Sequence, residues 1–501
     1  MSAFPTARVT DALKRAGLLV DVSGAVPERA ADITDDSRAV TPGAMFIAVR
    51  GSMQDGHEYL GDAAARGAAL AVVEDASRTN LPAIVVREGR RAAAIAAAAA
   101  FEEPAKSLRI AAVTGTNGKT TTVSLLRHLL DAPGAKAASI GTLGVLLGSA
   151  GTPMEGGAGL TTPGPVELQR VLRALVDQGV RSVAMEVSSH SLDQRRIDGL
   201  KFEVAVFTNL TRDHLDYHGT MEKYFEAKAR LIEYLTPRGA AVVNRDDPAW
   251  SNLPPAPCLI TFGLHAEATV RAEALHYQPR GSEWRLCAGS QRHALRLPLI
   301  GDFNVRNALA AAGAAWHLGL TFSAIAARLR TVPQVPGRLE VIHELPTVLR
   351  DYAHTPDALE RALAAVRPFT RRKLIVVFGC GGDRDRGKRP LMGAAAARAS
   401  DLVVITSDNP RTEDPGRILA DIEPGVRGEG LEPLPLHAPG SRGYVVEPDR
   451  PHAIALAVGL ARPGDLVVVA GKGHEDYQIV GVEKRHLDDR EEVRRALEQR
   501  A

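Results

Sequence analysis

Residues 110–121 read Ile-Ala-Ala-Val-Thr-Gly-Thr-Asn-Gly-Lys-Thr-Thr: an apolar strand leads into a glycine turn, and Lys-Thr-Thr opens a helix. The free backbone N–H groups of such a turn and the positive end of the helix dipole bind phosphate. The lysine of this motif reaches the terminal phosphates, and the threonine hydroxyl after it binds Mg²⁺. We therefore expect ATP, with Mg²⁺ as cofactor, to be held by Gly115, Thr116, Asn117, Gly118, Lys119, Thr120 and Thr121.

The turn differs from the usual phosphate loop at one position. The longer pattern has a glycine five residues before Gly118, where this chain has Val113, so the chain carries the shorter form Gly-x-x-Gly-Lys-Thr. A glycine turn without function is the alternative, but strand, turn, Lys-Thr and helix follow in the order that phosphate binding requires. The motif predicts ATP binding and leaves open what ATP is used for.

Composition narrows the class of protein. A chain of 501 residues with 45% hydrophobic content has room for roughly three domains of about 150 residues each. Its 61 basic and 59 acidic residues give a net charge of only +2, which argues against nucleic-acid partners and a polybasic membrane patch. The three cysteines show no metal-binding spacing, the N-terminal residues have no charged segment followed by an apolar core, and no apolar run approaches the length needed for membrane insertion. We expect a cytoplasmic protein.

The order of elements predicts an α/β protein of three domains. Residues 1–107 mix short strands with Ala-rich helices, one of them at 92–100. Residues 108–338 alternate strands and helices around the phosphate loop, which favours a central P-loop ATPase-type parallel sheet. In residues 339–501, apolar strands at 347–350, 373–378, 402–406 and 466–470 each precede a polar loop, which is typical of a Rossmann-like doubly wound sheet. The Gly/Pro-rich stretch 423–443 is interpreted as an exposed insertion.

Two further strands bring possible metal ligands to the phosphate loop. Glu186 follows the apolar strand 182–185, and strand 203–207 leads into a segment that contains Asp213, His214 and Asp216. Either group alone could be a solvated acid or a hydrogen-bonded histidine. Together with Thr120 they favour a metal site, and oxygen-rich ligation suits Mg²⁺ better than zinc.

Lys228 has unusual neighbours for a charged residue. On a helix predicted over 220–235, it shares one face with Tyr224, Phe225, Leu231, Ile232 and Leu235. A desolvated lysine has a lowered pKa and becomes nucleophilic enough to accept CO₂ as a carbamate. The alternative is that the amine extends past its apolar neighbours to solvent.

These residues together resemble the Mur ligase family, ATP-dependent enzymes that add amino acids to the peptidoglycan precursor. The resemblance covers essentially the whole chain. It rests on the phosphate loop, on Glu-Val-Ser-Ser-His at 186–190, on segments 209–216 and 224–228, on Gly-Asp-Phe-Asn-Val-Arg-Asn-Ala at 301–308, and on Gly337-Arg338. It implies that an acyl phosphate forms from ATP and a substrate carboxylate, and that an amine then displaces phosphate.

The resemblance also implies roles for individual residues. Lys228 would be carbamylated and would hold Mg²⁺ with Thr120, Glu186 and His214, and Lys119, Lys228 and His214 would be catalytic. Nucleotide contacts beyond the phosphate loop would come from Asn307, Arg338 and Asp351. The UDP-muramoyl-dipeptide (UDP-MurNAc-L-Ala-D-Glu) would be bound by Ser37, Ser52, Met53, Gln54, Thr161, Thr162, Ser188, Gln194 and Arg196. Leu160 stands where some relatives carry Asn, so one contact to the nucleotide sugar is in doubt.

The C-terminal motifs resemble those of family members that add meso-diaminopimelate. These motifs are Gly-Gly-Asp-Arg-Asp-Arg-Gly-Lys-Arg-Pro at 381–390, Asp-Asn-Pro-Arg at 408–411 and Gly-Lys-Gly-His-Glu-Asp-Tyr at 471–477. A planar guanidinium such as Arg411 is a natural bidentate partner for the distal carboxylate of that amino acid. The expected acceptor site comprises Arg384, Asp408, Asn409, Pro410, Arg411, Gly471 and Glu475. Without the resemblance, Arg411 could equally be a surface cation.

Several alternatives remain open at this point. The chain could be a lysine-adding or a folate-extending ligase, or a P-loop switch that responds to a macromolecular partner. The proton of the attacking amine could pass to His214, to Asp213 or to solvent. We expect the chain to act on small molecules as a monomer.

Overall fold

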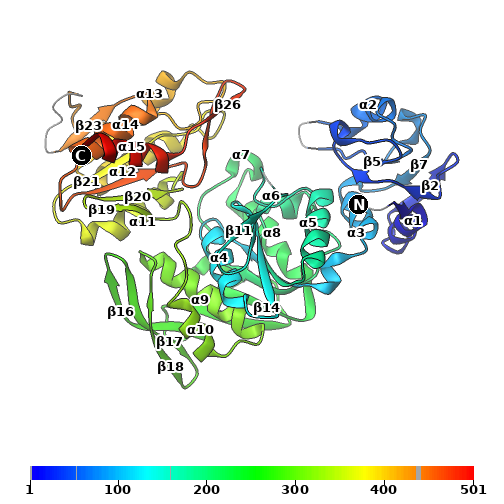
Figure 1. Cartoon of the computed structure of the whole chain (residues 1–501), viewed down its shortest axis with the longest axis horizontal. Helices are drawn as coiled ribbons and strands as arrows, with labels where there is room; N and C mark the ends of the chain where they lie inside the picture. Colours follow the sequence, from blue (N-terminus) through cyan, green and yellow to red (C-terminus); the bar gives the residue numbers. More distant parts are fainter. Residues whose placement is uncertain (1–2, 52–53, 158, 436–441, 501) are drawn as a thin grey trace.

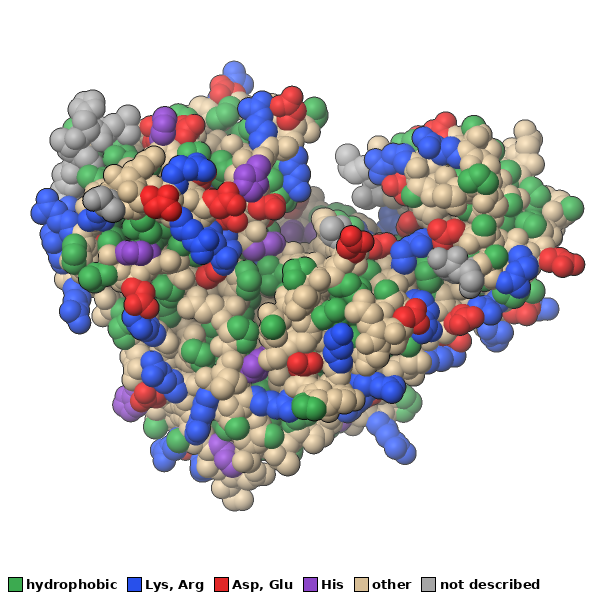
Figure 2. All heavy atoms as spheres, in the orientation of Figure 1, with side chains coloured by type: hydrophobic (Ala, Val, Ile, Leu, Met, Phe, Trp, Pro, Cys, Tyr) green, Lys and Arg blue, Asp and Glu red, His purple; other side chains and the backbone are tan. Residues whose placement is uncertain are grey.

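The computed structural model describes residues 3–51, 54–157, 159–435 and 442–500. The elements form three bodies in chain order, with the N-terminal and C-terminal bodies on either side of a central one (Figure 1). On the face shown in Figure 2, a hollow separates the two outer bodies, and acidic and basic side chains are interspersed. None of the described helices is long and apolar enough to cross a membrane.

The N-terminal body is built on a five-stranded sheet. Its order is β2 (Leu19–Ser23), β7 (Ala83–Val86), β6 (Leu70–Val73), β5 (Met45–Ile47) and β4 (Ile33–Thr34), and all its neighbours except β2 and β7 run parallel. The expected Ala-rich helix is α3 (Gly89–Ala100), whose alanines are largely buried and which packs against α1 (Thr6–Arg15). The helix α2 (Leu60–Ala65) lies on a second apolar cluster, with Leu60 and Ala63 buried there.

The central body contains an eleven-stranded sheet that is parallel in its middle and antiparallel at both ends. The central parallel strands are buried over most of their length, because apolar clusters cover both sheet faces. The strand order is β11 (Thr152–Met154), β10 (Gly144–Leu147), β9 (Lys136–Gly141), β12 (Val180–Glu186), β8 (Arg109–Thr114), β13 (Phe202–Phe207), β14 (Leu235–Asn244), β15 (Cys258–Gly263), β16 (Val270–Gln278), β17 (Gly281–Ala288) and β18 (Gln291–Leu297).

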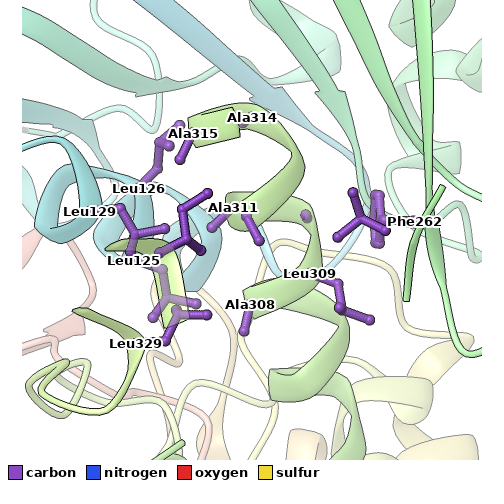
Figure 3. Packing of buried hydrophobic residues seen from close by; sticks show 14 of the residues in the cluster. Leu125, Leu126, Leu129, Phe262, Ala308, Leu309, Ala311, Ala314, Ala315 and Leu329 are labelled. Atoms are coloured by element: carbon purple, nitrogen blue, oxygen red, sulfur yellow. The ribbon is translucent and has the colours of Figure 1, made fainter. Parts of the chain in front are cut away.

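The helix after the phosphate loop is held in place by small side chains. In Figure 3, leucines of α4 (Lys119–Leu130) face alanines of α9 (Asp302–His317), and Leu329 of α10 (Phe322–Leu329) closes the cluster. The alanines allow the two helices to approach closely, so the N-terminus of α4 has a fixed position. On the other sheet face, α5 (Pro165–Asp177) buries Leu168, Leu172 and Leu175.

The C-terminal body is a six-stranded doubly wound sheet, as expected. Its order is β19 (Glu340–Glu344), β20 (Thr347–Asp351), β24 (Leu466–Ala470), β21 (Leu374–Phe378), β22 (Leu402–Ile405) and β23 (Gly443–Val446), and only β19 is antiparallel. One face is covered by α11 (Pro356–Val366), α12 (Lys388–Ala399) and α13 (Pro415–Gly428), the other by α14 (Arg450–Leu460) and α15 (Asp489–Arg500). A hairpin, β25 (Tyr477–Val480) and β26 (Glu483–His486), extends from this body.

The sequence predicted the wrong bounds for two segments. The helix predicted over 220–235 is α8 (Met221–Ala229) followed by a 3-10 turn, because Leu235 already begins β14. The stretch 423–443 is not wholly an insertion, since α13 continues through Pro424 to Gly428. A Cβ at Gly425 would overlap the Pro390 carbonyl of α12, so glycine there serves close helix packing. The proposed domain boundaries at 107/108 and 338/339 fall between elements and stay a prediction.

Candidate active site

The phosphate loop joins β8 to α4 and is closed by contacts that only glycine permits. Gly115 and Gly118 have φ of 139° and 86°. A Cβ at Gly115 would overlap the Thr208 hydroxyl, and one at Gly118 would overlap the Asn307 side chain. The Thr208 hydroxyl donates to the Asn117 carbonyl over 2.6 Å. The loop is therefore fixed between β8, β13 and α9 before any phosphate arrives.

Two lysine amines meet at this loop, one from half-buried Lys119 and one from buried Lys228. Lys119 Nζ donates to the Gly115 and Thr116 carbonyls over 2.9 and 2.8 Å, and Lys228 Nζ donates to the same Gly115 carbonyl over 2.9 Å. Burial lowers the pKa of both amines, and the charge of Lys119 lowers that of Lys228 further. Lys228 is 1% exposed, so the alternative that it extends to solvent is wrong.

The predicted metal ligands approach from neighbouring strands. Glu186 ends β12, and its carboxylate accepts from the Thr142 N–H and hydroxyl over 2.9 and 3.1 Å. His214 stands beside Asp213 after β13, and burial lowers the pKa of the imidazole. The Thr120 hydroxyl accepts from Arg338 Nη2 over 2.8 Å. Among the described residues no three His, Cys, Asp or Glu side chains group closely enough to hold a metal, so a metal site here depends on Thr120 and on modified Lys228.

All of these groups except Lys228 line one cavity of about 540 Å³. Asn307 lines it from α9, Asp351 ends β20, and Arg338 stacks on the Tyr352 ring at 4.5 Å. Burial raises the pKa of Asp351, whose carboxylate accepts from the Leu339 and Ala353 N–H groups. Of the residues predicted to bind ATP, all except Gly115 line this cavity: Thr116, Asn117, Gly118, Lys119, Thr120, Thr121, Asn307, Arg338 and Asp351.

A second cavity of about 590 Å³ opens beside the first. All the residues predicted to bind the acceptor line it except Pro410: Arg384, Asp408, Asn409, Arg411, Gly471 and Glu475. Arg411 Nη1 donates to the Gly382 carbonyl over 2.7 Å, which holds the guanidinium against the glycine-rich loop that begins at Gly381. The sequence left open whether Glu475 or Asp476 faces this space; Glu475 is the one that lines it.

The two cavities share four lining residues, namely Asp213, His214, Tyr352 and His354. Tyr352 and His354 were missed in the sequence, although they follow directly on Asp351 at the carboxyl end of a strand. His354 donates from Nδ1 to the Tyr352 carbonyl over 2.8 Å. Burial lowers the pKa of this histidine, so its Nε2 is an unprotonated acceptor at neutral pH.

The residues predicted to bind the muramoyl substrate form one connected group in the central body. The Thr162 hydroxyl donates to the Glu186 carbonyl over 3.0 Å and accepts from the Ser188 N–H over 3.1 Å. Arg196 donates to the Thr162 carbonyl over 3.2 Å and to the Gln194 amide oxygen over 2.6 Å. Thr161 lines the nucleotide cavity.

The N-terminal members of that set lie elsewhere. Ser37 is in a 3-10 turn of the N-terminal body, and Gln54 is exposed. Neither lines the two cavities, so a ligand that reached both groups would have to extend from one body to the other. Ser52 and Met53 lie outside the described residues. The neighbouring Asp35 faces Arg196, whose charge opposes the rise in the carboxyl pKa that burial causes.

Comparisons with known proteins give a consistent result. Residues 31–115 match the Mur ligase family catalytic domain, residues 113–315 the Mur ligase middle domain, and residues 337–473 the Mur ligase, glutamate ligase domain. The UDP-N-acetylmuramoyl-L-alanyl-D-glutamate--2,6-diaminopimelate ligase of Geobacillus thermodenitrificans is 46% identical over 476 residues, which cover 93% of this chain and 94% of that protein. The ligase of the same name from Gloeobacter violaceus is 45% identical over 505 residues, with 99% of both chains covered.

Solved structures agree in fold. A structure of a UDP-N-acetylmuramoyl-L-alanyl-D-glutamate--2,6-diaminopimelate ligase is 35% identical and superposes with a TM-score of 0.65 over 96% of this chain and 97% of that one. The MurF ligase of Thermotoga maritima, solved in complex with ADP, superposes with a TM-score of 0.64 at 19% identity, over 94% of this chain and 97% of that one. At that identity the second likeness shows the fold alone.

Proposed function

The chain belongs to the Mur ligase family, and from that membership we propose that it is an ATP-dependent ligase. It joins 2,6-diaminopimelate to UDP-N-acetylmuramoyl-L-alanyl-D-glutamate in the synthesis of the peptidoglycan precursor, the reaction named for relatives that match it along nearly its whole length. We propose the meso form of the amino acid and a cytoplasmic, monomeric enzyme.

The observation that carries this function is the junction of the two cavities. One is lined by the phosphate loop and the other by Arg411 and Glu475, and Asp213, His214, Tyr352 and His354 border both. A ligase of this kind needs such an arrangement, because the carboxylate activated by ATP must meet the incoming amine. A switch that binds ATP alone would not need the second, charged cavity.

The reaction proceeds in two steps. The γ-phosphoryl group of ATP passes to the free D-glutamyl carboxylate, which gives an acyl phosphate and ADP. The diaminopimelate amine then attacks the acyl carbon, the C–N bond forms, phosphate leaves, and the amine gives up a proton to His214, Asp213 or solvent. Neither step needs a side-chain nucleophile, so positioning and electrostatic stabilisation supply most of the rate.

Lys119 supplies positive charge where phosphate charge develops. Its amine is bound to two carbonyls of its own loop, and a bound triphosphate offers it stronger, charge-assisted acceptors. Arg338 reaches the same site from the start of the C-terminal body through the Thr120 hydroxyl. The C-terminal body therefore adds a second cation to the nucleotide site.

The residues present fit a Mg²⁺ ion. Thr120, Glu186 and His214 line the nucleotide cavity with two oxygen donors and one nitrogen donor, and carbamylation of Lys228 would add a carboxylate beside Gly115. A bound Mg²⁺ neutralises phosphate charge and orients the triphosphate. The unmodified Lys228 amine cannot act as a ligand while it is protonated, so the carbamate is part of this proposal.

The acceptor cavity supports diaminopimelate over lysine. Arg411 and Arg384 both border it and can bind the distal carboxylate that lysine lacks, while Asp408 and Glu475 can bind the distal ammonium. The muramoyl end is assigned to Thr161, Thr162, Ser188, Gln194 and Arg196, and the uridine end to the region of Ser37 and Gln54. A lysine-adding ligase remains the second candidate only if Arg411 does not select the acceptor.

The test is phosphate release by the purified chain with ATP, Mg²⁺, UDP-muramoyl-alanyl-glutamate and a panel of amino acids. We expect turnover with meso-diaminopimelate and little with L-lysine. Equal rates would remove the specificity assigned to Arg411. ATP turnover that ignored the muramoyl substrate and rose with a macromolecular partner would overturn the proposed function.

A further inference from the structure

Lys472 is a fully buried lysine directly behind the acceptor cavity. It follows Gly471 at the carboxyl end of β24 and is 0% exposed, and it is not among the residues that line the cavity. The proposed mechanism does not use it. A buried ammonium group is costly unless its hydrogens are paired, so its partners indicate its role.

The partners of Lys472 are two cavity-lining residues. Its Nζ donates to Asn409 Oδ1 over 3.2 Å and to Glu475 Oε2 over 3.3 Å. Asn409 Nδ2 donates to the same Glu475 oxygen over 3.0 Å, which closes a three-residue ring of hydrogen bonds. The amine thus contacts the cavity wall from its inner side.

The ring also fixes the turn that carries Arg411. Asn409 Oδ1 accepts a second hydrogen bond from the Ile479 N–H over 2.9 Å, and the Arg411 N–H donates to the Ile479 carbonyl over 3.0 Å. Lys472 therefore orients Asn409 at a point where the turn 408–411 is bound to the β25–β26 hairpin. Its loss would affect both the acidic and the basic side of the cavity.

The positive charge of Lys472 affects the neighbouring Glu475 carboxyl. Burial and the neighbouring Asp408 raise the pKa of the Glu475 carboxyl, and Lys472 opposes that rise. The other charged or titratable groups that face Glu475 are Arg411, Arg450, Tyr352 and Tyr477. Without Lys472, the buried carboxylate of Asp408 and the partly buried one of Glu475 would share the wall, and one of them would tend to hold a proton.

We propose that Lys472 is a positioning and specificity-determining residue for the acceptor amino acid, bonded to Glu475 and Asn409 so that both are oriented in the cavity wall to receive an ammonium group. The inference rests on the proposed function, because it concerns the acceptor of that reaction. Lys472 acts through Glu475 and Asn409 and does not touch the substrate itself. The class of ligand it serves is the distal ammonium of a diamino acid.

The experiment compares K472M, K472R and E475Q with the wild-type chain in the full reaction. We expect K472M to raise the KM for diaminopimelate about tenfold or more, because a charge-assisted hydrogen bond to the ammonium-binding carboxylate is lost. The KM values for ATP and the muramoyl substrate, and trapping of the acyl phosphate by hydroxylamine, should stay unchanged. K472R, which keeps the charge, should recover part of the loss.

Two further measurements separate this role from a purely structural one. In K472M the KM for diaminopimelate should fall as pH rises, because Glu475 then ionises without the help of Lys472. The loss in the double variant K472M/E475Q should be clearly smaller than the sum of the two single losses, since Lys472 acts in part through that carboxylate. The control is K484M, which removes an exposed lysine that lies 3.7 Å from the Tyr477 ring and is not bonded to Glu475.

Three results would contradict this role of Lys472. A wild-type KM for diaminopimelate in K472M overturns it, as does a parallel rise in all three KM values together with a lower melting temperature. Additive losses in K472M/E475Q would show that Lys472 does not act through Glu475. Failure of the wild-type chain to use diaminopimelate is a different result, because it removes the proposed function as well.

Discussion

Arg338 Nη2 donates a hydrogen bond of 2.8 Å to the hydroxyl of Thr120, 218 residues earlier in the chain. Thr120 lies in the first turn of α4 after the phosphate loop, and Arg338 precedes β19 at the start of the C-terminal body. The guanidinium also stacks on Tyr352 at 4.5 Å. The bond joins the two bodies at the nucleotide cavity.

Replacing Arg338 should weaken ATP binding selectively. R338K keeps the charge but loses the planar fork that can bond Thr120 and stack on Tyr352 together. We expect the KM for ATP to rise about ten- to a hundredfold, as befits a lost charge-assisted hydrogen bond, with the KM for diaminopimelate little changed. Steady-state kinetics measure this. R238K, at an exposed arginine of the central body, is the control, and an unchanged KM for ATP in R338K would contradict the assignment.

The fold was largely predictable because its strands are continuous apolar runs that end in polar loops. The strand 466–470 was predicted to the residue, and the apolar helix face of Lys228 indicated burial as one of two alternatives. Both depend on local pattern. The 220–235 helix was predicted too long because the start of β14 is set by pairing with β13 and not by propensity.

The residues of the site could be predicted from the sequence, but the hydrogen bonds between them could not. Local motifs identify Lys119 and Lys228, yet nothing local shows that both amines share the Gly115 carbonyl. The same holds for Arg338 with Thr120 and for Lys472 with Asn409. These pairs are distant in sequence, and packing between elements creates them.

Lys228 should be essential, and a small carboxylate should partly replace its carbamate. Because burial and Lys119 lower the pKa of its amine, the neutral form that reacts with CO₂ is present at a lower pH than for an ordinary lysine. Acidification below the lowered pKa protonates the amine and should release CO₂, so activity should fall as pH falls and bicarbonate should oppose the loss.

K228A should therefore lose most activity, and acetate or formate should restore a measurable fraction. K223A, on the exposed face of the same helix, is the matched control and should behave as wild type. Intact-mass or crystallographic detection of an unmodified amine in the active, bicarbonate-supplied enzyme would rule out the carbamate.

Arg411 should set the choice between diaminopimelate and lysine. R411M removes the guanidinium that faces the distal carboxylate, so kcat/KM for diaminopimelate should fall about tenfold or more, while the weak use of L-lysine should change little. Competition between the two amino acids measures the ratio directly. R417M, at an exposed arginine of α13, is the control and should leave the ratio of diaminopimelate to L-lysine use unchanged. If R411M also left this ratio unchanged, Arg411 would not select the acceptor.

The stability of the C-terminal body should depend on a fully buried ion pair between Arg450 and Asp489. Arg450 donates from Nε and Nη2 to the two carboxylate oxygens of Asp489, each over 2.7 Å, and both side chains are 0% exposed. The same guanidinium donates to the Ser407 and Ala470 carbonyls, so it also connects β24 with the loop after β22. R450M leaves Asp489 buried without its partner and should cost about 3–5 kcal/mol of unfolding free energy.

The double variant R450M/D489L removes both charges and should be distinctly more stable than R450M, because no uncompensated carboxylate remains buried. Urea unfolding followed by far-UV circular dichroism measures the order of stability. If R450M unfolds at the wild-type urea concentration, the pair contributes little. If the double variant is no more stable to urea than R450M, the loss of stability comes from the carbonyl contacts of Arg450 and not from the unpaired charge of Asp489.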